Sequence, residues 1–246
     1  MIEGADGTAA ILAGARDNGV DHMLCVAIDL ESLPEILKLA GENDCVSASI
    51  GIHPNTPLER EIPADELAEQ AGNPAFVAIG ETGLDYYRSQ GDLDWQRDRF
   101  RAHIQVAKAV DKPLIIHCRE ARDDVLQILR EEGADAVGGV MHCFVEDLDT
   151  AHRAMDLNFL ISFSGIVTFK NARDLQEVAR ALPLTAMLVE TDSPYLAPVP
   201  YRGKENQPAY VRYVAECIAG LRGISLEEVA EVTTRNFNER FLKKSL

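Results

Sequence analysis

The chain has 246 residues, of which 46% are hydrophobic and 26% are charged. This balance is typical of a folded globular protein and argues against a disordered chain. The formal net charge of −16 argues against a protein that coats nucleic acid through a basic surface. It still allows an enzyme that contacts phosphate only locally. At this length we expect one domain, residues 1–246.

Residues 1–6 have neither the basic flank nor the apolar core of a signal peptide. No later apolar run approaches the length needed to cross a membrane. The five cysteines are odd in number and show neither C-x-x-C spacing nor clustering, so we expect reduced thiols rather than disulfides or a zinc ribbon. The sequence therefore predicts a cytoplasmic protein without membrane contact, and it identifies no protein partner.

Apolar runs alternate with helical patterns along almost the whole chain, which predicts repeated β-α units around a parallel sheet. The expected strands lie near residues 22–28, 46–52, 76–81, 114–118, 137–143, 159–163 and 187–191. The clearest expected helices cover residues 8–18, 92–110, 121–132, 171–181, 209–221 and 225–242. Ser225 and Glu228 form a capping-box pattern, and Gly223 ends the helix before them. We predict an α/β fold of the TIM-like (β/α) barrel type.

The start of the chain departs from the barrel pattern. A (β/α)₈ barrel begins with a strand, whereas this chain opens on a helical pattern that stops at Gly19. About seven strands are expected here, against the eight that close such a barrel. We therefore expect the first strand to be absent. An open barrel would expose sheet edges, so impaired folding or association through that edge is an alternative outcome.

Four carboxylate or imidazole residues, Glu81, His117, His142 and Asp192, each follow an apolar run at an expected strand end. Parallel strands would bring these ends to one rim. Mixed oxygen and imidazole ligands suit one or two divalent cations such as Mg²⁺, Mn²⁺ or Zn²⁺. We predict that these four residues bind the metal and that Glu81 and Asp192 are catalytic. Strand alternation allows only one of Glu190 and Asp192 to face the site, and Asp192 lies nearer the rim.

Each ligand candidate also has a simpler interpretation. Glu81 could cap the following helix, and either histidine alone could be a core residue satisfied by hydrogen bonds. Two histidines at equivalent ends of successive strands favour a metal site, because histidine is the commonest metal-binding side chain.

Polar and basic residues in the neighbouring loops are candidates for substrate binding: His53, Arg119, Lys170, Arg202 and Asn206. These residues could contact a substrate phosphate, and bound cations would reverse the negative local charge. For His53 a structural role is equally open. For each basic residue a solvated surface is the simpler alternative, and the segment that holds Asn206, residues 201–208, is either a substrate loop or an exposed connection.

Motifs of other enzyme classes are missing from the sequence. It contains no G-x-S-x-G elbow, no Walker A loop and no dinucleotide fingerprint. These absences disfavour a serine hydrolase, a nucleoside triphosphatase and a dehydrogenase. Metal-assisted hydrolysis is the chemistry that the candidate residues still support.

Seven short motifs carry a family resemblance: GIHP at Gly51, GETGLDYY at Gly80, HCR at His117, HCF at His142, SFSGIVTF at Ser162, ETDSPYLAP at Glu190 and RGKENQP at Arg202. Through them the chain closely resembles the TatD family of metal-dependent deoxyribonucleases, within the amidohydrolase-like hydrolases. The resemblance runs from about Ala10 to the end. It implies a TIM-like barrel and the hydrolysis of phosphodiester bonds in DNA with divalent cations.

Matched motif by motif, the resemblance implies that Glu81 bridges two metals and that His117 and His142 bind one of them. Asp192 would bind the other metal and handle the water. Family members usually add an H-x-H pair from the first strand, and none of the six histidines here forms that pair. We expect the centre at Glu81, His117 and His142 to be retained better than the other one. Alternatives are a hydrolase of another ester or amide, or a non-catalytic descendant with an impaired site.

Overall fold

The computed structural model describes residues 7–243. Residues 1–6, on which the signal-peptide interpretation rests, lie outside this range. The strands are β1 (Met23–Cys25), β2 (Val46–Ile50), β3 (Phe76–Asp85), β4 (Leu114–Arg119), β5 (Gly139–Met141), β6 (Phe159–Phe163) and β7 (Met187–Val189). The α-helices are α1 (Gly7–Asp17), α2 (Leu33–Glu42), α3 (Ala64–Ala71), α4 (Asp94–Val110), α5 (Arg122–Glu131), α6 (Leu148–Met155), α7 (Arg173–Ala181), α8 (Val211–Arg222) and α9 (Leu226–Phe237).

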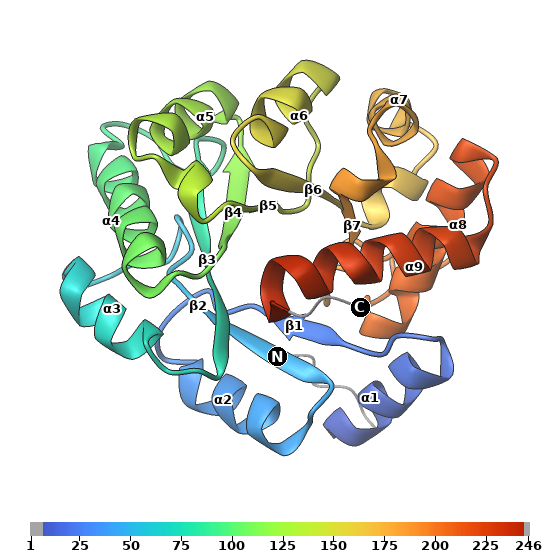
Figure 1. Ribbon diagram of the computed structural model, residues 1–246, viewed down its shortest axis with the longest axis horizontal. Helices are drawn as coiled ribbons and strands as arrows, with labels where there is room; N and C mark the ends of the chain where they lie inside the picture. The colour runs from blue at the N-terminus through green and yellow to red at the C-terminus, as the bar shows by residue number, and fades with distance from the viewer. Residues whose placement is uncertain (1–6, 244–246) are drawn as a thin grey trace.

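The sheet is parallel throughout, and its strands follow one another in sequence order from β1 to β7. Figure 1 shows the strands in the middle of the molecule and the helices arranged around them. This architecture confirms the predicted α/β fold of the TIM-like type. All seven expected strands are present in the part of the chain that the structure describes.

Apolar side chains form two buried regions. One lies between the strands and the surrounding helices, and the other lies on the inner face of the sheet. Phe241 belongs to the inner region together with side chains of β3, β4, β5 and β7. The residues around Phe241 lie at the amino ends of the strands, since Arg240 donates to the carbonyl of Val137 and Lys243 to that of Asp111. The C-terminal segment therefore fills the end of the sheet opposite the carboxyl ends, where the candidate ligands lie.

Strand β3 runs four residues further than predicted and ends at Asp85 rather than Glu81. A register shift between Ile79 and Thr82 lets it continue to pair with β4. Gly83 has φ +138°, and a Cβ there would overlap the backbone carbonyl of His117, so only glycine fits this close approach. The expectation that Glu81 ends its strand is therefore wrong, because the bulge carries the pairing past it.

The predicted helix caps around residue 225 are confirmed. Ser225 accepts a hydrogen bond from the backbone N–H of Glu228 at 3.1 Å, and Gly223 ends α8 in the left-handed conformation. The five cysteines are free. None of the helices in residues 7–243 is long and apolar enough to cross a membrane.

Candidate metal centre

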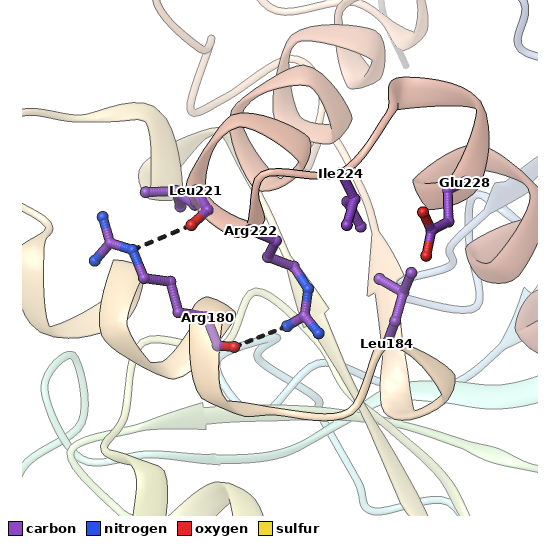
Figure 2. Close-up of a pocket in the computed structure, with 6 residues that line it drawn as sticks. All are labelled: Arg180, Leu184, Leu221, Arg222, Ile224 and Glu228. Atoms are coloured by element: carbon purple, nitrogen blue, oxygen red, sulfur yellow. Dashed lines mark hydrogen bonds between the residues drawn. The ribbon is translucent and has the colours of Figure 1, made fainter.

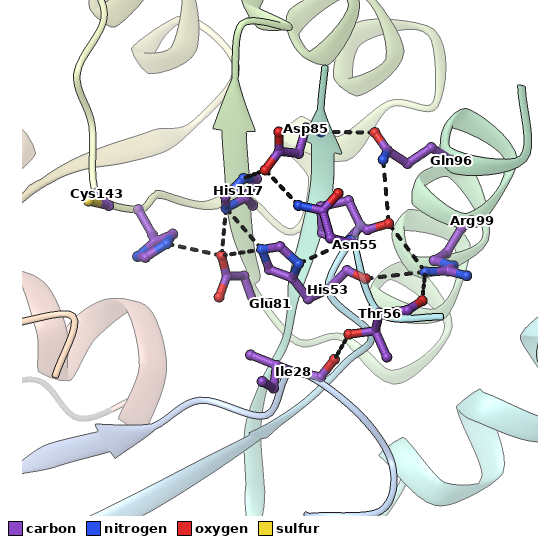
Figure 3. Close-up of polar contacts among 12 residues, drawn as sticks. Ile28, His53, Asn55, Thr56, Glu81, Asp85, Gln96, Arg99, His117 and Cys143 are labelled. Carbon is purple, nitrogen blue, oxygen red and sulfur yellow. Dashed lines mark hydrogen bonds and ion pairs between the residues drawn. The ribbon is translucent and has the colours of Figure 1, made fainter. Parts of the chain in front are cut away.

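Glu81 on β3 lies at the meeting point of three imidazoles. Its Oε1 atom is 2.8 Å from Nδ1 of His117, 3.1 Å from Nε2 of His142 and 3.6 Å from Nε2 of His53. His117 comes from β4, and the other two histidines follow β5 and β2. Figure 3 shows Glu81, His53 and His117 facing one another. The structure thus brings three of the four predicted ligands together and adds His53 to them.

His117 is held from behind by Asp85. Its Nε2 atom is 3.2 Å from Oδ2 of Asp85, a carboxylate that is only 1% exposed and also accepts from the Asn55 side chain at 2.6 Å. Burial alone would raise the pKa of Asp85, but these hydrogen bonds and one from a backbone N–H hold it well below its usual range. Asp85 therefore stays ionised and turns Nδ1 of His117 toward Glu81, as outer carboxylates do for metal-binding histidines.

His142 has an equivalent partner in Glu190. Nδ1 of His142 is 3.0 Å from Oε1 of Glu190, which also accepts from the backbone N–H of Cys143 at 3.0 Å. The expectation that strand alternation turns Glu190 away from the site is wrong. Residues two apart lie on the same face of a strand, so alternation does not separate Glu190 from Asp192, and both follow the end of β7 at Val189. The imidazoles of His117 and His142 thus each point one nitrogen at Glu81 and the other at a second carboxylate, that of Asp85 or Glu190.

His53 differs from the other two histidines in its hydrogen bonding. Its Nδ1 accepts from the backbone N–H of Asn55 at 3.1 Å, so in the neutral ring Nε2 carries the hydrogen. Burial lowers the pKa of His53 to about 4, against the opposing effect of Glu81, so the ring is neutral at pH 7. Donor atoms of His53, Glu81 and His117 lie within 4.8 Å of one another. A nitrogen that carries hydrogen cannot coordinate a cation, so His53 is better suited to donate a hydrogen bond to a substrate oxygen.

Asp192, the fourth predicted ligand, lies three residues beyond β7 in the left-handed conformation, with φ 60°. It is close enough to Glu190, Glu81 and His142 for their charges to act on it. Burial raises the pKa of Asp192 to about 6, with further increases from both glutamates and a decrease from His142. A carboxylate with this pKa can exchange a proton near neutral pH, which suits a general base.

The residues present fit a divalent cation. Glu81 and Asp192 offer carboxylate oxygens, and the nitrogens of His117 and His142 that face Glu81 could coordinate the same cation as Glu81. Both outer nitrogens are held by carboxylates, the arrangement that fixes ligating histidines in metal sites. Burial raises the pKa of Asp192, and the charges of Glu190 and Glu81 raise it further, so a cation bound nearby would lower it again. A thiolate ligand is not indicated, because burial raises the pKa of Cys118 and of Cys143 to about 12.

A buried polar row on α4 supports the loops that carry the site. Oε1 of Gln96 accepts from the backbone N–H of Asp85 at 2.8 Å, and Nε2 donates to Oγ of Ser89 at 3.1 Å. Nε2 of His103 accepts from the backbone N–H of Ile52 at 3.1 Å. Gln96 and His103 are buried. Helix α4 therefore holds both the end of β3 and the end of β2.

Arg99 completes this row. Its guanidinium donates to the carbonyl oxygens of His53 at 3.2 Å and Thr56 at 2.9 Å, and it forms two hydrogen bonds to Glu61. Figure 3 shows Arg99 and Gln96 beside the loop that carries His53 and Asn55. Because Arg99 is buried and donates to this loop in several directions, it fixes the loop's path.

The predicted substrate-binding residues divide into two groups. Arg119 ends β4, and Arg202 and Lys170 are exposed in loops. The guanidinium carbon of Arg119 lies 4.0 Å from the ring centroid of Tyr87, and that of Arg202 lies 4.2 Å from the ring of Phe169. These positions leave a substrate role open.

Asn206 is different, because it is fully buried. Its side-chain amide donates to the carbonyl oxygens of Thr191 at 2.8 Å and Tyr195 at 2.6 Å. These contacts indicate that Asn206 shapes the loop after Asp192, and its burial argues against direct contact with substrate. The sequence prediction missed this because a polar Gly- and Pro-containing segment usually lies at the surface.

Asp85 and Glu190 are the site residues that the sequence prediction missed. Asp85 stands four residues after Glu81 in the same GETGLD segment, and Glu190 stands two residues before Asp192. In both cases a second acid close in sequence to a predicted ligand indicates a further site residue. The prediction missed Asp85 because it ended the strand at Glu81, and it missed Glu190 because it treated two residues that share a strand face as lying on opposite faces.

A separate hollow lies where the end of α7 meets the link between α8 and α9, lined by Arg180, Leu184, Leu221, Arg222, Ile224 and Glu228 (Figure 2). Arg222 donates to the carbonyl oxygens of Ala179 and Leu182 at 2.8 Å each. It thus satisfies the last carbonyls of α7. The hollow contains none of the candidate ligands, and Arg222 has a structural role there.

The family model described as "TatD related DNase" matches residues 3–242. The uncharacterized metal-dependent hydrolase YcfH of Escherichia coli (strain K12) is 50% identical over 234 residues, which cover 94% of this chain and 87% of that protein. The uncharacterized metal-dependent hydrolase YabD of Bacillus subtilis (strain 168) is 42% identical, and the match covers 94% of this chain and 91% of that protein.

Two solved structures have the same fold. The crystal structure of YJJV, a TatD homolog from Escherichia coli k12, has a TM-score of 0.90 and 27% identity, and the match covers 98% of this chain and 94% of that one. A TatD family hydrolase from Entamoeba histolytica has a TM-score of 0.84 at 22% identity, over 95% of this chain and 89% of that one. The second likeness concerns the fold alone.

Proposed function

Because the chain belongs to the TatD family of metal-dependent hydrolases, we propose that it cleaves phosphodiester bonds in DNA. The observation that carries the proposal is the position of Glu81 between two imidazoles, each backed by a carboxylate. Glu81, His117 and His142 would hold one divalent cation, and Asp192 would bind there or hold a second one. Mg²⁺, Mn²⁺ and Zn²⁺ all suit this donor set.

A bound divalent cation supplies Lewis acidity toward a phosphoryl oxygen and stabilises the negative charge that develops on it. The Asp192 carboxylate accepts the proton of the attacking water. The water oxygen then forms a bond to phosphorus as the bond to the leaving oxygen breaks. His53 donates its Nε2 hydrogen to a phosphoryl oxygen. Asp85 and Glu190 keep the two ligand imidazoles oriented throughout.

Local positive charge supports DNA as the substrate. Arg119 is the last residue of β4, and Lys170 and Arg202 follow β6 and β7, at the strand ends where Glu81 lies. They provide phosphate contacts on a chain whose net charge is −16, so binding is confined to the site. The free cysteines agree with action in the cytoplasm.

The test uses purified, metal-free protein and an end-labelled single DNA strand at graded Mg²⁺ and Mn²⁺ concentrations. Asp192→Asn removes the proposed base, and Asp98→Asn changes an exposed aspartate of α4 in the same way. We expect metal-dependent cleavage that Asp192→Asn abolishes and Asp98→Asn retains. Cleavage without metal, cleavage unaffected by Asp192→Asn, or no cleavage under any condition would refute the proposal.

A further inference from the structure

The exposed large hydrophobic side chains of the described residues gather near one end of the sheet. They are Ile28, Tyr87, Trp95, Val145, Tyr195 and Val199. All but Trp95 lie in segments that follow strands β1, β3, β5 or β7, and these are the strand ends at which the Glu81 cluster lies. Apolar groups that border a charged centre indicate a ligand that is itself partly apolar.

Tyr87 is the member of this group tied most firmly to the centre. Its backbone N–H donates to Oδ1 of Asp85 at 3.0 Å, and Oδ2 of Asp85 lies 3.2 Å from His117. Arg119 pairs with Asp85 in the register of β3 and β4 and places its guanidinium carbon 4.0 Å from the Tyr87 ring centroid. The ring and its cation are thus fixed relative to the candidate metal ligands.

The aromatic ring of Tyr87 and the cation of Arg119 together favour binding of a ligand in which a planar group is joined to an anion. Arg119 covers one face of the Tyr87 ring, while the residue as a whole remains 57% exposed. An exposed aromatic face can stack on any of the nucleobases, and a neighbouring arginine attracts the phosphate of the same nucleotide. A base paired within a duplex cannot offer its face in this way.

We propose that Tyr87, positioned by Arg119 and Asp85, is the seat for the nucleobase next to the phosphodiester bond that is cleaved. The seat makes an unpaired base at that position a requirement for efficient binding. This inference rests on the proposed function, and it adds a specificity residue that the metal centre does not need for its own assembly.

The experiment compares two single DNA strands, one intact and one with a tetrahydrofuran abasic unit that is moved along the strand. Steady-state cleavage with Mn²⁺ is measured for the wild type, Tyr87→Ala and Tyr87→Phe. We expect Tyr87→Ala to raise KM for the intact strand by about tenfold, within the range of one base–aromatic stack. Tyr87→Phe keeps the ring and should match the wild type. On the strand whose abasic unit occupies the seat, wild type and Tyr87→Ala should differ by less than about twofold.

Two cleavage results would overturn the seat: no effect of Tyr87→Ala, or an equal loss on the intact and abasic strands. If the wild type cleaves no strand, the proposed function fails, and the seat is judged by binding instead. Anisotropy of a fluorescent single strand then measures affinity for the wild type and for Tyr87→Ala. An affinity about tenfold weaker in the variant would support Tyr87 as the seat for a nucleobase. Equal affinity, or no binding by the wild type, overturns it.

Discussion

The two carboxylate–histidine pairs around Glu81 are built differently. Asp85, behind His117, is 1% exposed and its pKa is held well below the usual range by hydrogen bonds from His117, Asn55 and the backbone. Glu190, behind His142, has a side chain that is 19% exposed, and it accepts from His142 and from one backbone N–H. The carboxylate of the first pair is therefore buried and has several hydrogen-bond partners, whereas that of the second has fewer partners and lies nearer to solvent.

The supports behind the two pairs differ as well. Gln96, Arg99 and His103 of α4 bind the loops on the β3 side. On the β7 side a long loop is held by Asn206, and it carries Asp192, whose pKa is raised to about 6. The comparison indicates that the two sides of the site have different roles. The β3 and β4 side orients a ligand, and the β7 side keeps a carboxylate that can take up a proton.

The largest effect is expected for Glu81, which both pairs share. Glu81→Ala should lower activity by on the order of a thousandfold, the upper end of what one electrostatic group contributes. Its matched control is Glu69→Ala, at an exposed position of α3. Initial cleavage rates at saturating metal are the measurement. If the variant binds metal normally and retains most of its activity, the assignment of the centre is wrong.

The contrast between the pairs predicts unequal losses of metal affinity. Asp85→Asn should weaken Mn²⁺ binding toward the upper end of the range of about 10- to 100-fold seen for outer carboxylates. Glu190→Gln should fall toward the lower end, because its carboxylate is more solvated and has fewer partners. Calorimetric titration of the metal-free variants measures both. Equal losses, or a larger loss for Glu190→Gln, would remove the distinction between the two sides.

Support from α4 can be tested by comparing two glutamines. Gln96→Leu leaves the backbone N–H of Asp85 without its acceptor, which should lower the free energy of unfolding by about 1–3 kcal/mol. Gln127→Leu changes an exposed glutamine of α5 and should stay within about 0.5 kcal/mol. Urea unfolding monitored by circular dichroism gives both values. Equal stabilities would show that Gln96 does not support the site loops.

His103 predicts how stability depends on pH. Its Nδ1 lies 2.8 Å from the carbonyl of Arg99 and its Nε2 accepts from Ile52, and burial lowers its pKa to about 4. The unfolded chain, with an ordinary histidine pKa of about 6.5, binds the proton more readily. The stability from this group is therefore complete above pH 6.5 and is lost as the pH falls toward 4.

From pH 7 to pH 5 we expect this group to lower the free energy of unfolding by about 2 kcal/mol. The measurement is urea unfolding at the two pH values. His103→Gln should lose this part of the pH dependence, and His152→Gln, at an exposed position of α6, should keep it. If His103→Gln shows the same pH dependence as the wild type, another group is responsible.

The sequence predicted those parts of the fold and site that depend on local pattern. Apolar runs between helical patterns indicated every strand, and the shared rim of parallel strands explains why Glu81, His117 and His142 were expected to meet. The extension of β3 depends on a register shift against β4, which no local pattern records. The polar row of α4 resembles an ordinary amphipathic surface, because the partners of Gln96 and His103 lie in other loops.

Crystals grown with Zn²⁺ would show where a cation binds, through the anomalous signal of the metal. We predict the strongest peak at about 2.0–2.2 Å from a carboxylate oxygen of Glu81, from Nδ1 of His117 and from Nε2 of His142. His53 should remain outside the coordination shell. A peak coordinated by His53 in place of His142, or no peak at Glu81 when the metal is saturating, would contradict this centre.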